Sequence, residues 1–131
     1  MAAEITLIDT NIFIRFLTAD DPEGDERSAA LFQRIEEGEI RGMVPDFIVA
    51  EVVYVLRRIY KVPRREITNA LKRLLTLEHL DTDNKIVTFE ALEIYGERNI
   101  DFADALLCAR SELYGYGIAS LDRDLKRCGG R

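Results

Sequence analysis

Apolar and polar residues alternate along this chain in a way that predicts short strands separated by amphipathic helices. The run 4–9 is apolar and partly β-branched, as is typical of a buried strand. Similar short runs predict strands at 42–45, 80–81 and 118–121. Between them, apolar residues recur at helical spacing. Helices are predicted over residues 10–17, 22–38, 46–59, 63–75, 84–95 and 101–114.

Strands that alternate with helices imply a parallel sheet with helices on both faces. Right-handed crossovers then place the carboxyl end of every strand at the same edge of the sheet, where open α/β sheets bind their ligands. Asp9 and Asp122 each follow a predicted strand. The pattern therefore predicts that these two carboxylates share one edge.

Composition fits one globular domain over residues 1–131, with 47% hydrophobic and 32% charged residues. No apolar run approaches the roughly 18 residues needed to span a bilayer. The first residues, MAAEITLIDTN, carry neither a basic segment nor a long apolar one, so no signal peptide is expected. We therefore expect a cytoplasmic protein with no membrane partner.

The charge distribution leaves two interpretations open. A net charge of −6 argues against a simple electrostatic nucleic-acid binder. Residues 57–73, however, hold seven basic residues and only one acid, Glu66. This segment is either a solvated helix surface or a face that binds phosphate. Its basic residues are Arg57, Arg58, Lys61, Arg64, Arg65, Lys72 and Arg73.

The two cysteines give no sign of a metal site. Cys108 falls in an apolar helical pattern, which predicts a small buried hydrophobic residue. Cys128 falls in the C-terminal tail. Their spacing matches no zinc motif, so a zinc site is not expected.

Two carboxylates stand in unusual places in the first half of the chain. One interpretation of Asp9 is a helix cap, but Thr10 and Asn11 cap equally well, which leaves Asp9 surplus for that role. Glu51 lies on a helix that is apolar nearly all round. It must reach the surface or bind a partner, because an unpaired buried charge is very costly.

Two more acids follow in the second half. Asp104 lies one turn into its helix among apolar neighbours, and it points either to a pocket or to the helix start. Asp101 is explained by the helix start alone. Asp122 directly follows the last predicted strand. Two like charges about 4 Å apart repel by roughly 4 kcal/mol at an effective dielectric of 20, so clustered carboxylates usually bind a divalent cation.

Four segments together resemble the PIN domain family and, more narrowly, the VapC-type toxin ribonucleases. They are LIDTNIFI, IVAEVVYVL, DFADALLCA and IASLDRDL, and their order and spacing are similar to the family over essentially the whole chain. The resemblance implies a three-layer α/β/α fold with a short central parallel sheet. The family often adds a strand after the fourth motif, so four or five strands are expected.

The resemblance also implies a site and an activity. Asp9, Glu51, Asp104 and Asp122 would hold Mg²⁺ or Mn²⁺ and cut RNA, either with one ion or with two. Asn11, Ser120 and Asp101 would support them. The implied partners are an RNA substrate, a small antitoxin and a second copy of the chain. An acidic edge needs basic residues nearby to bind RNA, and the candidates are Arg57, Arg58, Lys61, Arg64 and Arg65.

Three other functions remain possible from the residues. A phosphatase of the haloacid dehalogenase type needs an aspartate two residues after the first, where this chain has Asn11. A phospho-receiver domain needs a lysine after a late strand, and the segment around Lys126 fits that poorly. A binding module that kept the fold and lost catalysis is the third. The presence of all four acids favours an enzyme over this last possibility.

Overall fold

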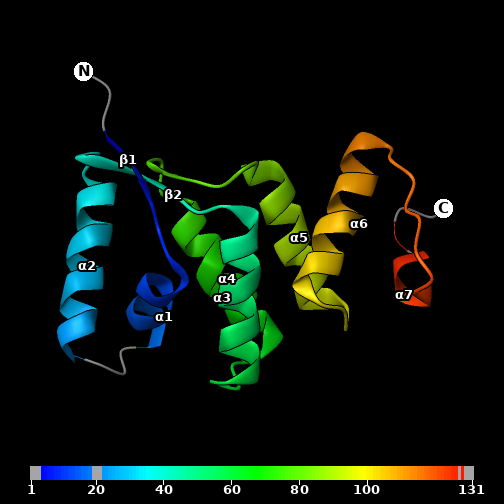
Figure 1. Ribbon diagram of the computed structural model, residues 1–131, viewed down its shortest axis with the longest axis horizontal. Helices are drawn as coiled ribbons and strands as arrows, with labels where there is room; N and C mark the ends of the chain where they lie inside the picture. The colour runs from blue at the N-terminus through cyan, green and yellow to red at the C-terminus, as the bar shows by residue number, and fades with distance from the viewer. Residues whose placement is uncertain (1–3, 19–21, 127, 129–131) are drawn as a thin grey trace.

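The computed structural model describes residues 4–18, 22–126 and 128. Short parallel strands alternate with helices, as the pattern predicts (Figure 1). The strands are β1 (Glu4–Leu7), β2 (Ile40–Met43) and β3 (Leu80–Asp81), and the helices are α1 (Thr10–Thr18), α2 (Pro22–Glu36), α3 (Asp46–Arg58), α4 (Arg64–Leu75), α5 (Lys85–Glu97), α6 (Phe102–Tyr114) and α7 (Arg123–Lys126).

The sheet has the order β1-β2-β3, and both pairings are parallel. Its central strand carries Gly42, which lies opposite Leu80. A Cβ at Gly42 would come within 2.8 Å of side-chain carbons of both Ile8 and Ile35. Glycine is therefore required here because the side chains of two neighbouring elements close over the strand.

The second strand begins two residues earlier than predicted. Pro45 cannot donate to a sheet, and it instead takes an extended conformation (φ −62°, ψ 157°) as the N-cap residue of α3. The backbone N–H of Val44 still donates to Asp81 O at 2.8 Å. The chain thus passes directly from the sheet into the helix that carries Glu51.

The predicted strand at 118–121 is wrong, so the described residues form three strands rather than four or five. Gly115 ends α6 in the left-handed conformation (φ 73°), and Ser111 Oγ then donates to Tyr116 O at 2.6 Å. Leu121 is 99% exposed. These contacts hold the segment at the end of α6, and α7 lies at the opposite end of the molecule from β1 (Figure 1).

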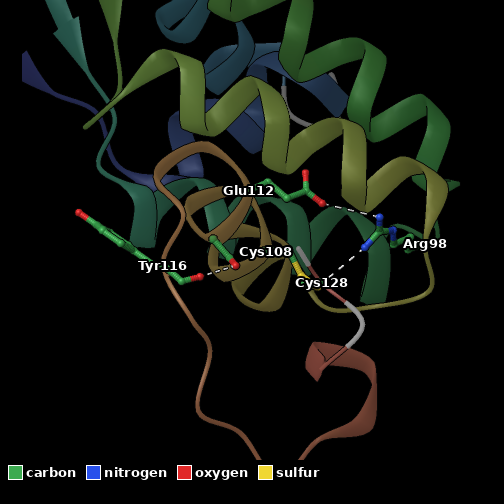
Figure 2. The surroundings of a disulfide bond; sticks show 6 residues. Arg98, Cys108, Glu112, Tyr116 and Cys128 are labelled. Carbon is green, nitrogen blue, oxygen red and sulfur yellow. Dashed lines mark hydrogen bonds and ion pairs between the residues drawn. A yellow bond between two sulfur atoms is a disulfide. The ribbon is translucent and has the colours of Figure 1, made fainter. Parts of the chain in front are cut away.

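The cysteine prediction is only half right. Cys108 is fully buried, as expected, but it forms a disulfide bond with Cys128 (Figure 2). Cys128 is 2% exposed, and the Arg98 guanidinium lies 3.8 Å from its sulfur. The disulfide joins the end of the described chain to the middle of α6. Sequence spacing alone does not reveal such a pairing.

Helices cover the sheet unevenly. Helices α4, α5 and α6 pack side by side, while α1 packs against α2 and α3. The expected parallel sheet flanked by helices is present, although the first strand leaves Ile5 and Leu7 exposed.

Two local features match the sequence closely. Asn84 caps α5, because its side-chain oxygen accepts hydrogen bonds from the backbone N–H groups of Ile86 and Val87. The start of α3 is tied to α6 by an ion pair between Asp46 and Arg110. Among the described residues, every helix is too short or too polar to cross a lipid bilayer.

Candidate functional site

Asp9 lies just beyond the carboxyl end of β1, directly before α1. Its Oδ1 accepts a hydrogen bond from Thr10 N at 2.8 Å, and its backbone carbonyl accepts one from Ile12 N. Asp9 therefore does occupy the start of the helix, and its side chain remains exposed. The positive end of α1 favours a carboxylate at this place.

Glu51 reaches the surface, which resolves the conflict between its charge and its apolar helix. Its neighbours Val49, Val52 and Val53 are buried, whereas Glu51 is exposed on the opposite side of α3. Asp9 and Glu51 line one cleft of about 550 Å³, together with Asn11. We call it the Asp9 cleft. The structure therefore brings two of the four acids together, with the predicted supporting amide beside them.

A second cleft of about 660 Å³ begins at the same glutamate. We call it the Arg57 cleft. Four of the five basic residues expected to bind RNA line it. Those lining residues are Arg57, Arg58, Lys61 and Arg64, and Asp101 lies among them with Tyr54 and Tyr95. Glu51 therefore lines both the Asp9 cleft, which holds two carboxylates, and the mostly basic Arg57 cleft.

Arg64 has a structural task in the wall of this cleft. Its Nη1 donates to the backbone oxygens of Tyr95, Arg98 and Ile100 at 2.8–3.1 Å. Its guanidinium also lies 4.2 Å from the centre of the Tyr95 ring. Burial raises the pKa of the Tyr95 hydroxyl despite this nearby positive charge, so the ring stays neutral at physiological pH.

Arg65 is placed differently from the other basic residues. It is not among the residues that line the Arg57 cleft, and its guanidinium lies 3.8 Å from the carboxylate of Glu93. Lys72 also pairs with Glu93. The structure therefore divides the basic segment into residues that face the cleft and residues that join α4 to α5.

The other two predicted acids, Asp104 and Asp122, lie on α6 and directly before α7. Asp104 is half-buried in the first turn of α6. Asp122 is exposed in the loop before α7, and its backbone N–H donates to Ser120 Oγ at 2.9 Å. Neither Asp104 nor Asp122 lines the two clefts described above. The strand that was expected to carry Asp122 to the edge of the sheet is absent from residues 115–122.

The donor chemistry of the Asp9 cleft fits a hard divalent cation. Within residues 4–18, 22–126 and 128, no three acidic, histidine or cysteine side chains form a group able to enclose a metal ion. Magnesium does not require such a group, because it is usually held by one or two carboxylates with waters and substrate phosphates. Asp9 and Glu51 supply two carboxylates, and Asn11 adds an amide.

Tyr54 was missed by the sequence reasoning. It lines the Arg57 cleft, is 60% exposed, and lies under the Arg58 guanidinium at 5.8 Å from the ring centre. The available signal was its spacing, since it stands three residues after Glu51 and therefore on the same side of the helix. The surrounding run of valines hid that signal.

The fold and its clefts define an α/β protein with carboxylates at the carboxyl end of its parallel sheet. The chain belongs to the PIN domain family, whose model matches residues 6–130. It is also similar to a VapC ribonuclease of Aquifex aeolicus (strain VF5), with 27% identity over 124 residues, which is 94% of this chain and 91% of that protein. The resemblance stated from the four motifs is thereby confirmed.

Proposed function

We propose that this protein is an endoribonuclease that hydrolyses RNA phosphodiester bonds with Mg²⁺ or Mn²⁺. One observation carries the proposal: Glu51 lines both the Asp9 cleft and the basic Arg57 cleft. A phosphate held by the basic residues would therefore lie next to the carboxylates. Membership of the PIN family and the similarity to a protein named VapC ribonuclease support the same activity.

Each part of the site has a role in this proposal. Asp9 and Glu51 hold the cation, with Asn11 orienting Asp9, and Arg57, Arg58 and Lys61 bind the phosphates on one side. When bound, the cation makes a water more acidic and offsets the charge that develops on the phosphate. Asp101 faces the same space from the start of α6. Asp104 and Asp122 complete the acidic set in this proposal, and Ser120 supports Asp122.

Cation dependence is the first test. Purified protein is expected to cut fluorescently labelled single-stranded RNA in Mg²⁺ or Mn²⁺ and to stop when the metal is chelated. Cleavage should return when the metal is added back in excess, because in the proposed mechanism the cation activates the attacking water. Cleavage that continues unchanged in chelator would rule out the metal mechanism. Metal binding by calorimetry without cleavage of any RNA would favour a binding module instead.

A third groove shares no lining residue with these two clefts. Helices α1, α2 and α4 enclose a groove of about 730 Å³ with an apolar floor that includes Phe16, Phe32 and Leu74. Glu36, Glu37 and Arg73 stand at its sides. We propose that the protein is the toxin of a type II toxin-antitoxin pair and that this groove binds an apolar segment of its antitoxin. In the same proposal, the protein is a homodimer and acts in the cytoplasm.

Co-expression with the adjacent reading frame tests the partner. We expect the two proteins to purify together, with light scattering showing two copies of this chain in the complex. A Leu74→Glu variant is expected to lose the partner, because a charge would then lie in the apolar floor of the groove. RNA cleavage by that variant alone should stay unchanged, since Leu74 lines neither cleft. If the protein is monomeric and does not bind the product of the adjacent reading frame, the antitoxin proposal and the homodimer proposal are both wrong.

A further inference from the structure

Two exposed aromatic side chains flank Glu51 on the outer face of α3. Phe47 is 71% exposed and Tyr54 is 60% exposed. Phe47 is four residues before Glu51, and Tyr54 is three residues after it, so all three share one face of the helix. Seven residues return the helix to within about 20° of the same direction. Along this face of α3, the Glu51 carboxylate therefore lies between the aromatic rings of Phe47 and Tyr54.

The core does not require these rings. The opposite face of α3 is already buried through Val49, Val52, Val53 and Leu56. Tyr54 lines the Arg57 cleft, and Phe47 lies on the same face of α3, two helical turns before Tyr54. Two large aromatic surfaces left in water on one helix face are informative, whereas scattered exposed apolar residues are not. The position of this pair, one ring on each side of Glu51, favours a ligand that presents two flat apolar surfaces about a central charge.

The positive charge next to the Tyr54 ring indicates the kind of ligand. The Arg58 guanidinium lies 5.8 Å from the centre of the Tyr54 ring, and Arg57 and Lys61 line the same cleft. A basic groove that adjoins stacking rings is the usual means of binding single-stranded nucleic acid. The protein is acidic overall, so this local positive charge stands out.

We propose that nucleobases on either side of the scissile phosphate stack on Phe47 and Tyr54, which makes the substrate single-stranded and locally unstacked RNA. This inference rests on the proposed ribonuclease activity. Seven residues separate the two ring positions by about 10 Å along the helix. Consecutive bases in a stacked strand lie only about 3.4 Å apart. A duplex cannot reach both rings, whereas a loop or a flexible strand can.

A protein partner fits this face less well. A second copy or an antitoxin seated here would cover Glu51, and burying an unpaired carboxylate is very costly. RNA would bring its phosphates to the basic residues and leave the carboxylate to the cation. The structure therefore favours RNA, and a protein occupant becomes a distinct outcome of the test.

Binding is measured with catalytically silent protein, so that cleavage does not interfere. In an Asp9→Asn background, Tyr54→Leu and Phe47→Leu are each expected to weaken binding of labelled single-stranded RNA about tenfold. Tyr54→Phe keeps the aromatic face and should stay within about twofold. Tyr116→Leu is the matched control, because Tyr116 is also 60% exposed but lies in the loop after α6. An RNA duplex of the same sequence should compete weakly.

The outcomes separate this inference from the proposed function. If the unaltered protein cuts RNA while both leucine variants, still folded by circular dichroism, bind RNA as the control does, the stacking sites are wrong and the ribonuclease stands. If the unaltered protein cuts no RNA, the proposed function itself fails. If the leucine variants change the oligomeric state by light scattering and leave RNA affinity unchanged, the face is a protein interface and the stacking proposal is overturned.

Discussion

An Asp9→Asn variant is expected to keep its fold and to lose RNA cleavage by about a hundredfold to a thousandfold. Asparagine retains the oxygen that accepts the hydrogen bond from Thr10 N at 2.8 Å, so the start of α1 is preserved. It removes the negative charge that would hold the cation, and metal-assisted charge stabilisation is worth several kcal/mol. Glu51→Gln should behave alike, because Glu51 lines the same cleft.

Asp83→Asn provides a matched control for this prediction. Asp83 also accepts a backbone hydrogen bond, from Asp46 N at 2.8 Å, but it lines neither cleft. Its substitution removes the same charge and should leave the cleavage rate within about twofold. Initial rates at saturating Mg²⁺, with thermal melts of every variant, provide the comparison. Equal rates for Asp9→Asn and the control would remove Asp9 from the site.

The same assay measures the two acids that lie outside the Asp9 cleft. If Asp104 and Asp122 act with Asp9 as proposed, Asp104→Asn and Asp122→Asn will each cause a loss of the same order. A loss restricted to Asp9 and Glu51 would reduce the working site to the two carboxylates that share the cleft.

Removing the disulfide is expected to lower the free energy of unfolding by about 3 kcal/mol. Cys108 and Cys128 are 20 residues apart, and closing a loop of that size restricts the unfolded chain by about this amount. For a domain of this length, the melting temperature should fall by about 10 °C. A Cys128→Ser variant, melted by circular dichroism, tests the change.

A dithiol reductant supplies the control for the disulfide prediction. Reduction should lower the melting temperature of the unaltered protein and leave that of Cys128→Ser unchanged. An unaltered protein that melts identically with and without reductant would show that the bond does not contribute. Because thiol reductants keep most cytosolic cysteines reduced, a cytoplasmic protein of this sequence would lose this stabilisation whenever the bond is opened.

Much of the fold follows from local patterns in the chain. The first strand, predicted over 4–9 and found at Glu4–Leu7, the brief strand at 80–81 and the Asn84 cap were all predictable from sequence, because each depends on neighbouring residues and on the spacing of apolar side chains. The strand at 118–121 failed for the opposite reason. Its apolar residues permit a strand, but a strand also needs a paired neighbour, and within the described residues this segment pairs with none of β1, β2 and β3.

In the candidate site, too, the residues that could be predicted are those whose signal is local in the sequence. Asp9 and Glu51 were recognisable because each is out of place in its own element, and the structure puts both in one cleft. The role of Arg64 was not recognisable, since it binds carbonyl oxygens 31 to 36 residues further along the chain. A basic residue that contacts phosphate and one that fixes a helix junction look identical in sequence.

The contacts of Arg64 give the Arg57 cleft one fixed wall and one adjustable wall. A single guanidinium joins the start of α4 to the end of α5 and to the turn before Asp101, which restrains that side of the cleft. The facing wall consists of long exposed side chains on α3, which change rotamer easily. Ligands of different width would therefore be accommodated by the helix that carries Glu51, while the opposite side keeps its shape.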